Sequence, residues 1–109
     1  MAAGLLVLAG CSGSLDSAEA RLVHRVEPVY PAQAYAEGLE GYVLLEFTIS
    51  EDGVPTEIKV VQSEPRGVFD AAAIAAVEQW RYQPRLRLGR AVPTEEAEAG
   101  VRFTIPTAQ

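Results

Sequence analysis

Residues 42–50 alternate between apolar and polar side chains. The apolar residues at every second position are Val43, Leu45, Phe47 and Ile49. Because successive side chains of an extended chain point to opposite faces, this period of two predicts a strand with one buried face.

A second strand is expected over residues 56–62, where Ile58 and Val60 face the same side as the apolar residues of the first strand. Asp52 and Gly53 lie between the two strands, and these residue types favour tight turns through local hydrogen bonding and a positive φ. Two such segments joined by a turn predict a β-hairpin.

Residues 69–81 follow a different period, with apolar side chains at steps of three and four. These residues are Phe69, Ala72, Ala73, Ala76, Val77 and Trp80. The spacing predicts an amphipathic helix, and Asp70 at its start suits both capping and the helix dipole. Pro84 cannot continue a helix, so residues 85–90 are expected to form a loop.

Two shorter elements are expected near the ends of the folded region. A brief helix over residues 32–37 has Pro31 near its first position and Gly38 as its stop. A last strand ends at Pro106, and three of its residues share one face: Val101, Phe103 and Ile105.

The chain has 109 residues, of which 49% are hydrophobic and 22% charged, and its formal net charge is -6. This length and composition fit one folded domain. The excess of acidic residues disfavours partners that are bound by neutralising phosphates, so we expect no nucleic-acid partner.

Side chains for metal binding or catalysis are scarce. His24 is the single histidine and Cys11 the single cysteine, so neither a metal site nor a cofactor is expected. Asp52 and Asp70 have roles in a turn and at a helix start. With no nucleophile elbow, phosphate-binding loop or acid-base pair in the sequence, we expect no enzyme.

A short apolar run, residues 4–10, precedes Cys11. It is too short to span a membrane, and a run of this kind that ends in small residues is typical of a secretory signal. The sequence Leu-Ala-Gly-Cys resembles the bacterial lipobox, in which the cysteine is acylated and becomes the first mature residue. An unmodified cysteine in an N-terminal tail is the alternative, and no basic residue precedes the run.

Three regions are therefore expected: a lipoprotein signal-like segment at 1–11, a flexible tether at 12–25 and a folded domain at 26–106. Ser12 follows the cysteine, a pattern that resembles the sorting signal for the outer membrane. We expect a periplasmic protein held by lipidated Cys11 in the periplasmic leaflet of the outer membrane.

Landmark residues follow one another in a distinctive order from residue 26 to residue 105. The most specific segment is Trp80, Arg81, Tyr82 and Pro84 after an alanine-rich helix. The other landmarks are Tyr30, Pro31, Gly41, Val43, Phe47, Asp52, Gly53, Val60, Ser63, Phe69, Asp70, Ala73, Val77, Gly89, Val101 and Phe103. Together they resemble the C-terminal domain of the TonB family. The resemblance implies an α+β fold, with a small antiparallel three-stranded sheet and two helices packed on one face.

The resemblance also implies a partner, because outer-membrane receptors add an extended segment, the TonB box, to the sheet edge of this family. Such β-augmentation uses the unpaired backbone groups of an edge strand. The expected partner-binding residues are Glu27, Pro28, Val101, Arg102, Phe103 and Thr104. Glu27 stands where several family members have Gln. The acidic residues Glu95, Glu96 and Glu98 favour basic peptides.

Aromatic residues near the helix are expected in the core and not in a ligand pocket. The expected core residues are Tyr30, Phe47, Phe69, Val77, Trp80 and Tyr82. A basic cluster, Arg81, Arg85, Arg87 and Arg90, could face lipid head groups or peptidoglycan carboxylates. It could equally be a solvated loop with partial pairing to the helix C-terminus.

Three functions remain open. The first is a lipid-anchored periplasmic module that pairs with an extended segment of an outer-membrane receptor or another envelope protein, without the energy-transducing half of the family's activity. The second is a complete TonB energy transducer whose N-terminal membrane helix is missing from this gene model. The third is a structural envelope lipoprotein that forms a homodimer through its edge strands.

Overall fold

The computed structural model describes residues 17–106. The segment 1–11, Cys11 itself and the first part of the expected tether lie outside the described residues.

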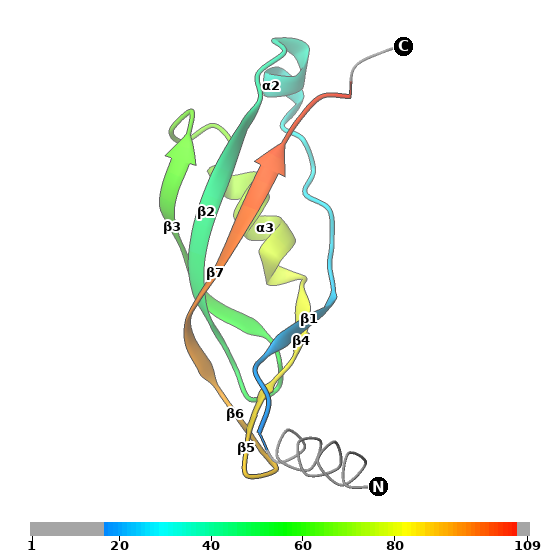
Figure 1. Ribbon diagram of the computed structural model, residues 1–109. Helices are drawn as coiled ribbons and strands as arrows, with labels where there is room; N and C mark the ends of the chain where they lie inside the picture. The colour runs from blue at the N-terminus through cyan, green and yellow to red at the C-terminus, as the bar shows by residue number, and fades with distance from the viewer. Residues whose placement is uncertain (1–16, 107–109) are drawn as a thin grey trace, which may run out of the picture.

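An antiparallel three-stranded sheet forms the centre of the molecule (Figure 1). Its strands are β2, Gly41–Ile49, β3, Pro55–Glu64, and β7, Thr94–Phe103, in the order β3-β2-β7. The alternating side chains of β2 are buried on one face and half-buried on the other. The α+β fold class expected from the sequence is confirmed.

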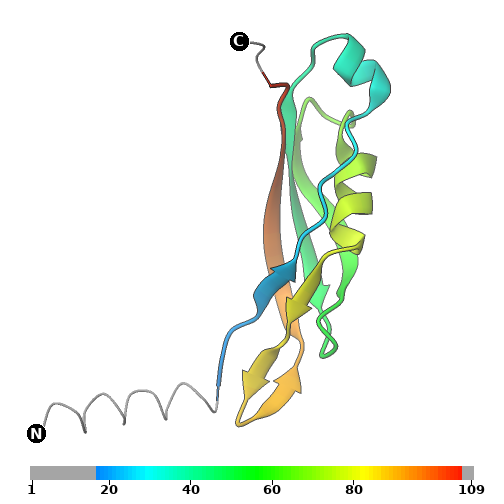
Figure 2. The same cartoon turned by 90° about the vertical axis from the view of Figure 1, so that its right-hand side faces the viewer.

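One helix covers the buried face of the sheet. This helix, α3, spans Asp70–Glu78 and packs against β3 and β2. The short helix α2, Ala32–Ala36, lies on the same side at one end of the sheet, as Figure 2 shows. Ala73 and Ala76 are buried on the inner face of α3, where their small side chains let the helix lie close to the strands.

The core lies between α3 and the sheet. Phe69 and Phe103 stack with ring centroids 4.4 Å apart, and Tyr30 meets the edge of both rings. The buried apolar residues are Ala34, Val43, Leu45, Phe47, Ile49, Phe69, Ala73, Ala76, Val77, Trp80, Val101 and Phe103.

Two further strand pairs extend the molecule away from α2. Strand β1, Arg21–His24, pairs with β4, Arg81–Gln83, and β5, Arg85–Arg87, pairs with β6, Arg90–Val92. The structure therefore differs from the expected tether over residues 21–24 and from the expected loop over 85–90. Contacts distant in sequence account for the first difference, since Arg21 Nη2 donates to Gln83 Oε1 over 3.0 Å.

Helix α3 also differs from expectation at both ends. Phe69 is its N-cap residue, no side chain caps the helix, and Asp70 begins its first turn. The expected capping role of Asp70 is therefore wrong, and one of its carboxylate oxygens is buried without a hydrogen-bond partner among the described residues. The helix ends at Glu78, so Trp80 packs into the core from the segment that follows.

The last strand begins earlier and ends earlier than its apolar pattern suggested. Ile105 follows the end of β7 and is half-buried, and its N-H donates to Glu40 Oε2 over 2.7 Å. The side chain of Glu40, just before β2, thus holds the segment that follows β7.

Candidate functional site

Strand β7 forms one edge of the central sheet. Its inner side pairs with β2 from Gly41↔Phe103 to Ile49↔Thr94, and no strand between residues 17 and 106 pairs with its outer side. The outward N-H and C=O groups of β7 can therefore accept another extended chain.

A β-bulge divides β7 into two parts. Phe47 lies opposite Ala97 and Ile49 opposite Thr94, so β7 carries one residue more than β2 across this interval. Glu96 has a φ of 58°, in the left-handed region that is costly for a residue with a side chain. Bulges of this kind bend a strand and end regular pairing. The regular part of the edge therefore runs from Ala97 to Phe103.

The core-facing side chains of β7 differ in size along the strand. Val101 and Phe103 are 0% and 2% exposed, so their side chains cannot contact a partner, and only their backbone groups remain available at the edge. Both side chains fill the core, so the expected partner binding at these two positions stays a prediction that concerns their backbone groups. Ala97 and Ala99 are half-buried and pack at the margin of the core. Their small side chains leave room beside the edge.

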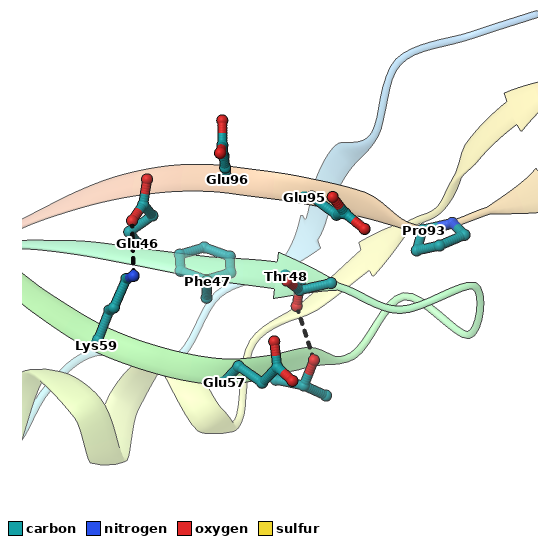
Figure 3. Close-up of a pocket in the computed structure, with 9 residues that line it drawn as sticks. Glu46, Phe47, Thr48, Glu57, Lys59, Pro93, Glu95 and Glu96 are labelled. Carbon is teal, nitrogen blue, oxygen red and sulfur yellow. Dashed lines mark hydrogen bonds and ion pairs between the residues drawn. The ribbon is translucent and has the colours of Figure 1, made fainter.

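The other face of β7 carries charge. Glu98 and Arg102 are exposed there, opposite Glu46 and Tyr42 of β2. Glu95 and Glu96 are exposed at the bulge, and in Figure 3 Glu96 lies on the side of β7 away from β2. None of these four β7 side chains forms an ion pair within the described chain. Thr104, just after the strand, is also exposed.

A hollow of about 580 Å³ lies across the three strands next to the bulge. Its lining residues are Glu46, Phe47, Thr48, Thr56, Glu57, Lys59, Pro93, Glu95 and Glu96. Lys59 Nζ lies 3.4 Å from Glu46 Oε1, and Thr56 Oγ1 donates to the carbonyl of Thr48 over 3.2 Å (Figure 3). Four carboxylates and one ammonium make the hollow electronegative.

Strand β3 carries a matching irregularity on the opposite side of β2. Glu57 has a φ of 53°, and β3 gains one residue over β2 between Thr56 and Lys59. Sequence reasoning did not find this hollow, because it followed the apolar positions and not the breaks between them. The local signal that could have found it is the break in alternation at Thr56 and Glu57, two polar residues in a row.

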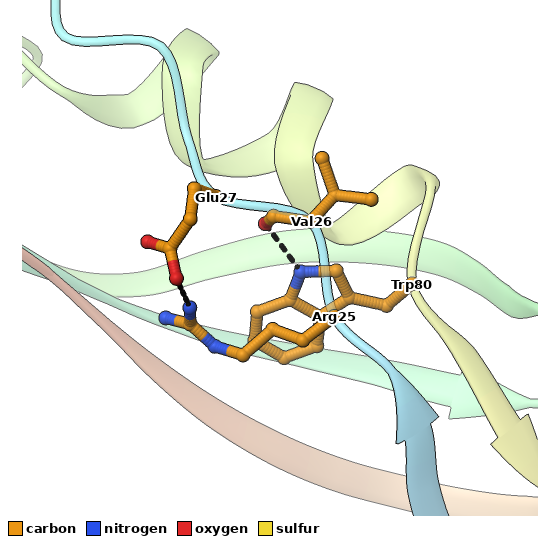
Figure 4. A network of polar contacts seen from close by, with 4 residues as sticks. All are labelled: Arg25, Val26, Glu27 and Trp80. Atoms are coloured by element: carbon orange, nitrogen blue, oxygen red, sulfur yellow. Dashed lines mark hydrogen bonds and ion pairs between the residues drawn. The ribbon is translucent and has the colours of Figure 1, made fainter.

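The extended segment 25–31 runs along α3 on the side of the molecule where the sheet ends in β7, as Figures 1 and 2 show together. Trp80 Nε1 donates to the carbonyl of Val26 over 2.9 Å (Figure 4). The guanidinium of Arg25 lies 5.3 Å from the centroid of the Trp80 ring and also pairs with Glu27. Glu27 is exposed and Pro28 is half-buried. The carboxylate of Glu27 is therefore already paired with Arg25 in the unbound chain.

Tyr30 and Tyr82 are half-buried at the margin of the core, whereas Phe47, Phe69, Val77 and Trp80 lie inside it. The hydroxyl of Tyr30 donates to the carbonyl of Leu39. Loss of hydration raises the pKa of Tyr30, and the nearby Glu40 and Tyr35 raise it further. Burial also raises the pKa of Tyr82. Both side chains are therefore held in the neutral form.

Among residues 17–106, no group of three or more His, Cys, Asp or Glu residues is placed to hold a metal ion. No helix in this range is long and apolar enough to cross a membrane.

Residues 26–105 match the family model described as Gram-negative bacterial TonB protein C-terminal. The chain belongs to the TonB C-terminal family. The domain is 40% identical over 81 residues to Protein TonB of Pseudomonas aeruginosa, a match that covers 74% of this chain and 24% of that protein. It is 42% identical over 71 residues to tonB2 of the same organism, covering 65% of this chain and 26% of that protein. The chain thus matches about a quarter of the length of these TonB proteins.

Solved TonB domains share the fold. The solution structure of the Pseudomonas aeruginosa TonB C-terminal domain superimposes with a TM-score of 0.70 at 34% identity, over 87% of this chain and 95% of that one. The TonB2 protein of Vibrio anguillarum gives a TM-score of 0.61 at 38% identity, over 82% and 84% of the two chains. Both fold and family expected from the sequence are confirmed.

Proposed function

We propose that this chain is a periplasmic TonB-type module whose β7 edge takes up an extended segment of an outer-membrane receptor or another envelope protein. The observation that supports this function best is the outer side of β7, which no described strand covers. Backbone pairing at such an edge provides affinity, and the side chains on either side of it provide selectivity.

Backbone pairing alone is too weak for a specific complex. Three or four added hydrogen bonds, at roughly 0.5 to 1.5 kcal/mol net each, contribute about 2 to 6 kcal/mol. Micromolar affinity needs about 8 kcal/mol. Side chains of the guest must therefore supply the remainder.

The two faces beside β7 favour different guest side chains. On the core side, Ala97 and Ala99 are small, and the half-buried Val26 and Tyr30 also pack against the core. Apolar guest side chains would extend the core there. On the other side, Glu96 and Glu98 favour basic guest residues. We therefore propose a guest that alternates between apolar and basic residues.

A titration followed by NMR tests the proposed function. The ¹⁵N-labelled chain is titrated with a synthetic peptide of alternating valine and lysine, and separately with the same peptide carrying glutamate for lysine. The lysine peptide should shift the amide signals of residues 97–103 and bind more tightly than the glutamate peptide. Unchanged β7 signals with both peptides would overturn the proposal.

Charge reversal on β7 provides the matched variants for this titration. Glu98→Lys should weaken binding of the lysine peptide about fivefold, because an exposed ion pair worth up to about 1 kcal/mol is replaced by a repulsion. Glu51→Lys, in the exposed turn before β3, changes net charge equally but lies off the edge. If both variants weaken binding by the same factor, long-range attraction and not the edge would explain the affinity.

The proposed anchor is Cys11, outside the described residues, and it rests on the resemblance of residues 8–11 to a lipobox. Acylation would hold the module at the periplasmic leaflet of the outer membrane. Metabolic labelling with palmitate should mark the native chain and not Cys11→Ser. Equal labelling of the two would remove the anchor from the proposal.

Pairing of two β7 edges in a homodimer is a second candidate. Within the regular part of the edge, Glu98 and Arg102 lie equally far from Gly100, so an antiparallel pair centred on Gly100 would place each glutamate opposite the arginine of the other copy. Sedimentation equilibrium should then show a dimer that Arg102→Glu dissociates. A monomer at all concentrations would exclude this candidate.

A further inference from the structure

The hairpin of β5 and β6 ends in an exposed tip of unusual composition. Arg87 pairs with Arg90 across the hairpin, and Leu88 and Gly89 form the turn with φ values of 52° and 78°. Two residues with positive φ in a two-residue hairpin loop are the mark of a type I′ turn. The first of these positions favours Asn, Asp or Gly, so leucine is out of place.

Nothing in the described structure compensates for leucine at this position. A left-handed backbone strains a residue with a bulky side chain. Leu88 is 81% exposed, so its side chain gains no burial in return. A local rule broken without an internal benefit points to a contact outside the folded chain.

The four arginines of the basic cluster have separate roles in the structure. Arg81 donates to the carbonyl of Glu78 over 3.0 Å at the end of α3, and Arg85 lies 3.8 Å from Glu19. Arg87 and Arg90 are exposed and join no ion pair within residues 17–106. Only these two cations flank the exposed leucine.

The tip lies at the end of the molecule where the described chain begins, far from α2 (Figures 1 and 2). The backbone of Ala18 exchanges hydrogen bonds of 3.1 and 2.8 Å with Leu86, and the N-H of Leu88 lies 3.4 Å from the Ser17 hydroxyl oxygen. At about 3.4 Å per residue, the chain from Cys11 to Ser17 spans at most about 20 Å. A bilayer that held Cys11 would therefore face this end of the domain.

We propose that the β5–β6 tip docks on an anionic phospholipid bilayer. Leu88 enters the boundary between head groups and acyl chains, and Arg87 and Arg90 bind the lipid phosphates. An apolar residue flanked by cations suits an interface that is apolar below and negatively charged above. The contact would orient the domain on the membrane and leave the β7 edge accessible, and it does not depend on peptide binding there.

Site-specific fluorescence tests the docking directly. In the full chain with Cys11→Ser, the variant Leu88→Cys is labelled with the environment-sensitive fluorophore NBD. The control is Tyr35→Cys with the same label, since Tyr35 is 56% exposed on α2 at the other end. Vesicles of phosphatidylethanolamine and phosphatidylglycerol should raise the fluorescence at position 88 several-fold and leave position 35 unchanged. Vesicles of phosphatidylcholine alone should give a much smaller response at position 88 and again none at position 35.

Charge variants test the role of the arginines. Arg87→Gln and Arg90→Gln should each lower partitioning to the anionic vesicles about fivefold, the effect expected for one basic residue near such a surface. Arg66→Gln is the matched control, because Arg66 is exposed in the connection between β3 and α3. Added salt should reduce binding of the unmodified tip and have less effect on a variant that carries both Arg87→Gln and Arg90→Gln.

Two results would overturn the proposal. One is an equal response at positions 88 and 35, which would mean that the tip does not enter the bilayer. The other is an equal response to neutral and anionic vesicles with both tip arginine variants unchanged. Retention by isolated peptidoglycan without any vesicle response would assign the two arginines to carboxylates instead, and would also refute bilayer docking.

Discussion

Trp80 donates its indole N-H to the main-chain carbonyl of Val26, with Nε1 and O 2.9 Å apart. The bond joins the residues just after α3 to the start of the extended segment that runs beside the helix (Figure 4). Arg25 adds a cation-π contact to the same ring. One buried indole thus fixes the segment that flanks the β7 edge.

Trp80→Phe should lower the free energy of unfolding by about 2 kcal/mol, because it removes a hydrogen bond and leaves empty part of the core volume that the indole fills. Denaturant unfolding measures the change. Glu78→Gln, on an exposed part of the same helix end, should stay within about 0.5 kcal/mol of the native value. An unchanged Trp80→Phe midpoint would show that the segment is held by other contacts.

Gly53 should tolerate no side chain. Its φ is 83°, and an added Cβ would lie 2.0 Å from the carbonyl oxygen of Tyr82, a backbone atom that cannot move aside. Gly53→Ala should therefore cost more than the roughly 1 kcal/mol of a left-handed alanine. Gly67→Ala is the control, since Gly67 has a φ of 80° and nothing within 4 Å of an added Cβ. Equal losses of stability would refute the close approach.

Tyr30 should make the fold less stable in alkaline solution. Its pKa in the folded chain lies above the ordinary value of about 10, so the unfolded chain loses its proton first as pH rises. The resulting stability is fully present below about pH 10 and is lost as pH rises through the folded pKa. Tyr30→Phe should show a shallower fall in unfolding free energy between pH 8 and 11. An identical fall would assign the effect to other groups.

Ala99→Leu should weaken guest binding without unfolding the domain. Ala99 is half-buried at the margin of the core, and a larger side chain there would fill the space beside the edge that the guest needs. We expect about a tenfold loss of peptide affinity. Gly100→Ala on the same strand has nothing within 4 Å of the added Cβ and should leave affinity unchanged. Equal affinities of the two variants would argue against packing at this margin.

The central hairpin and the main helix could be predicted from the sequence because their apolar periods are regular. From Val43 to Ile49 every second residue is apolar and buried, and the burial of α3 follows the alanines of its apolar face. The family, too, could be predicted from short landmarks such as Trp80 to Pro84 and from their order along the chain.

Strands β1, β4, β5 and β6 escaped prediction for physical reasons. All four are short and none contains a fully buried residue, so they have no apolar period, and β1 pairs with residues far along the chain, as in Arg21↔Gln83. The β5–β6 turn contains Leu88 and Gly89 and lacks the Asn-Gly signal of such hairpins.

The sequence predicted a last strand, but neither the burial of its side chains nor its first residue. Alternation placed Val101 and Phe103 on one face, yet only the fold shows that their side chains are already enclosed by the core. The start of β7 at Thr94 was hidden because the bulge at Glu96 interrupts the pattern.

That bulge also sets a size limit. The regular part of β7, from Ala97 to Phe103, measures about 23 Å at roughly 3.3 Å per residue. A longer guest segment would reach the β-bulge at Glu96 and lose its pairing register beyond it. If the edge binds a guest as proposed, the guest segment that pairs in register is limited to about the length of residues 97–103, and the bulge would interrupt further pairing along this edge.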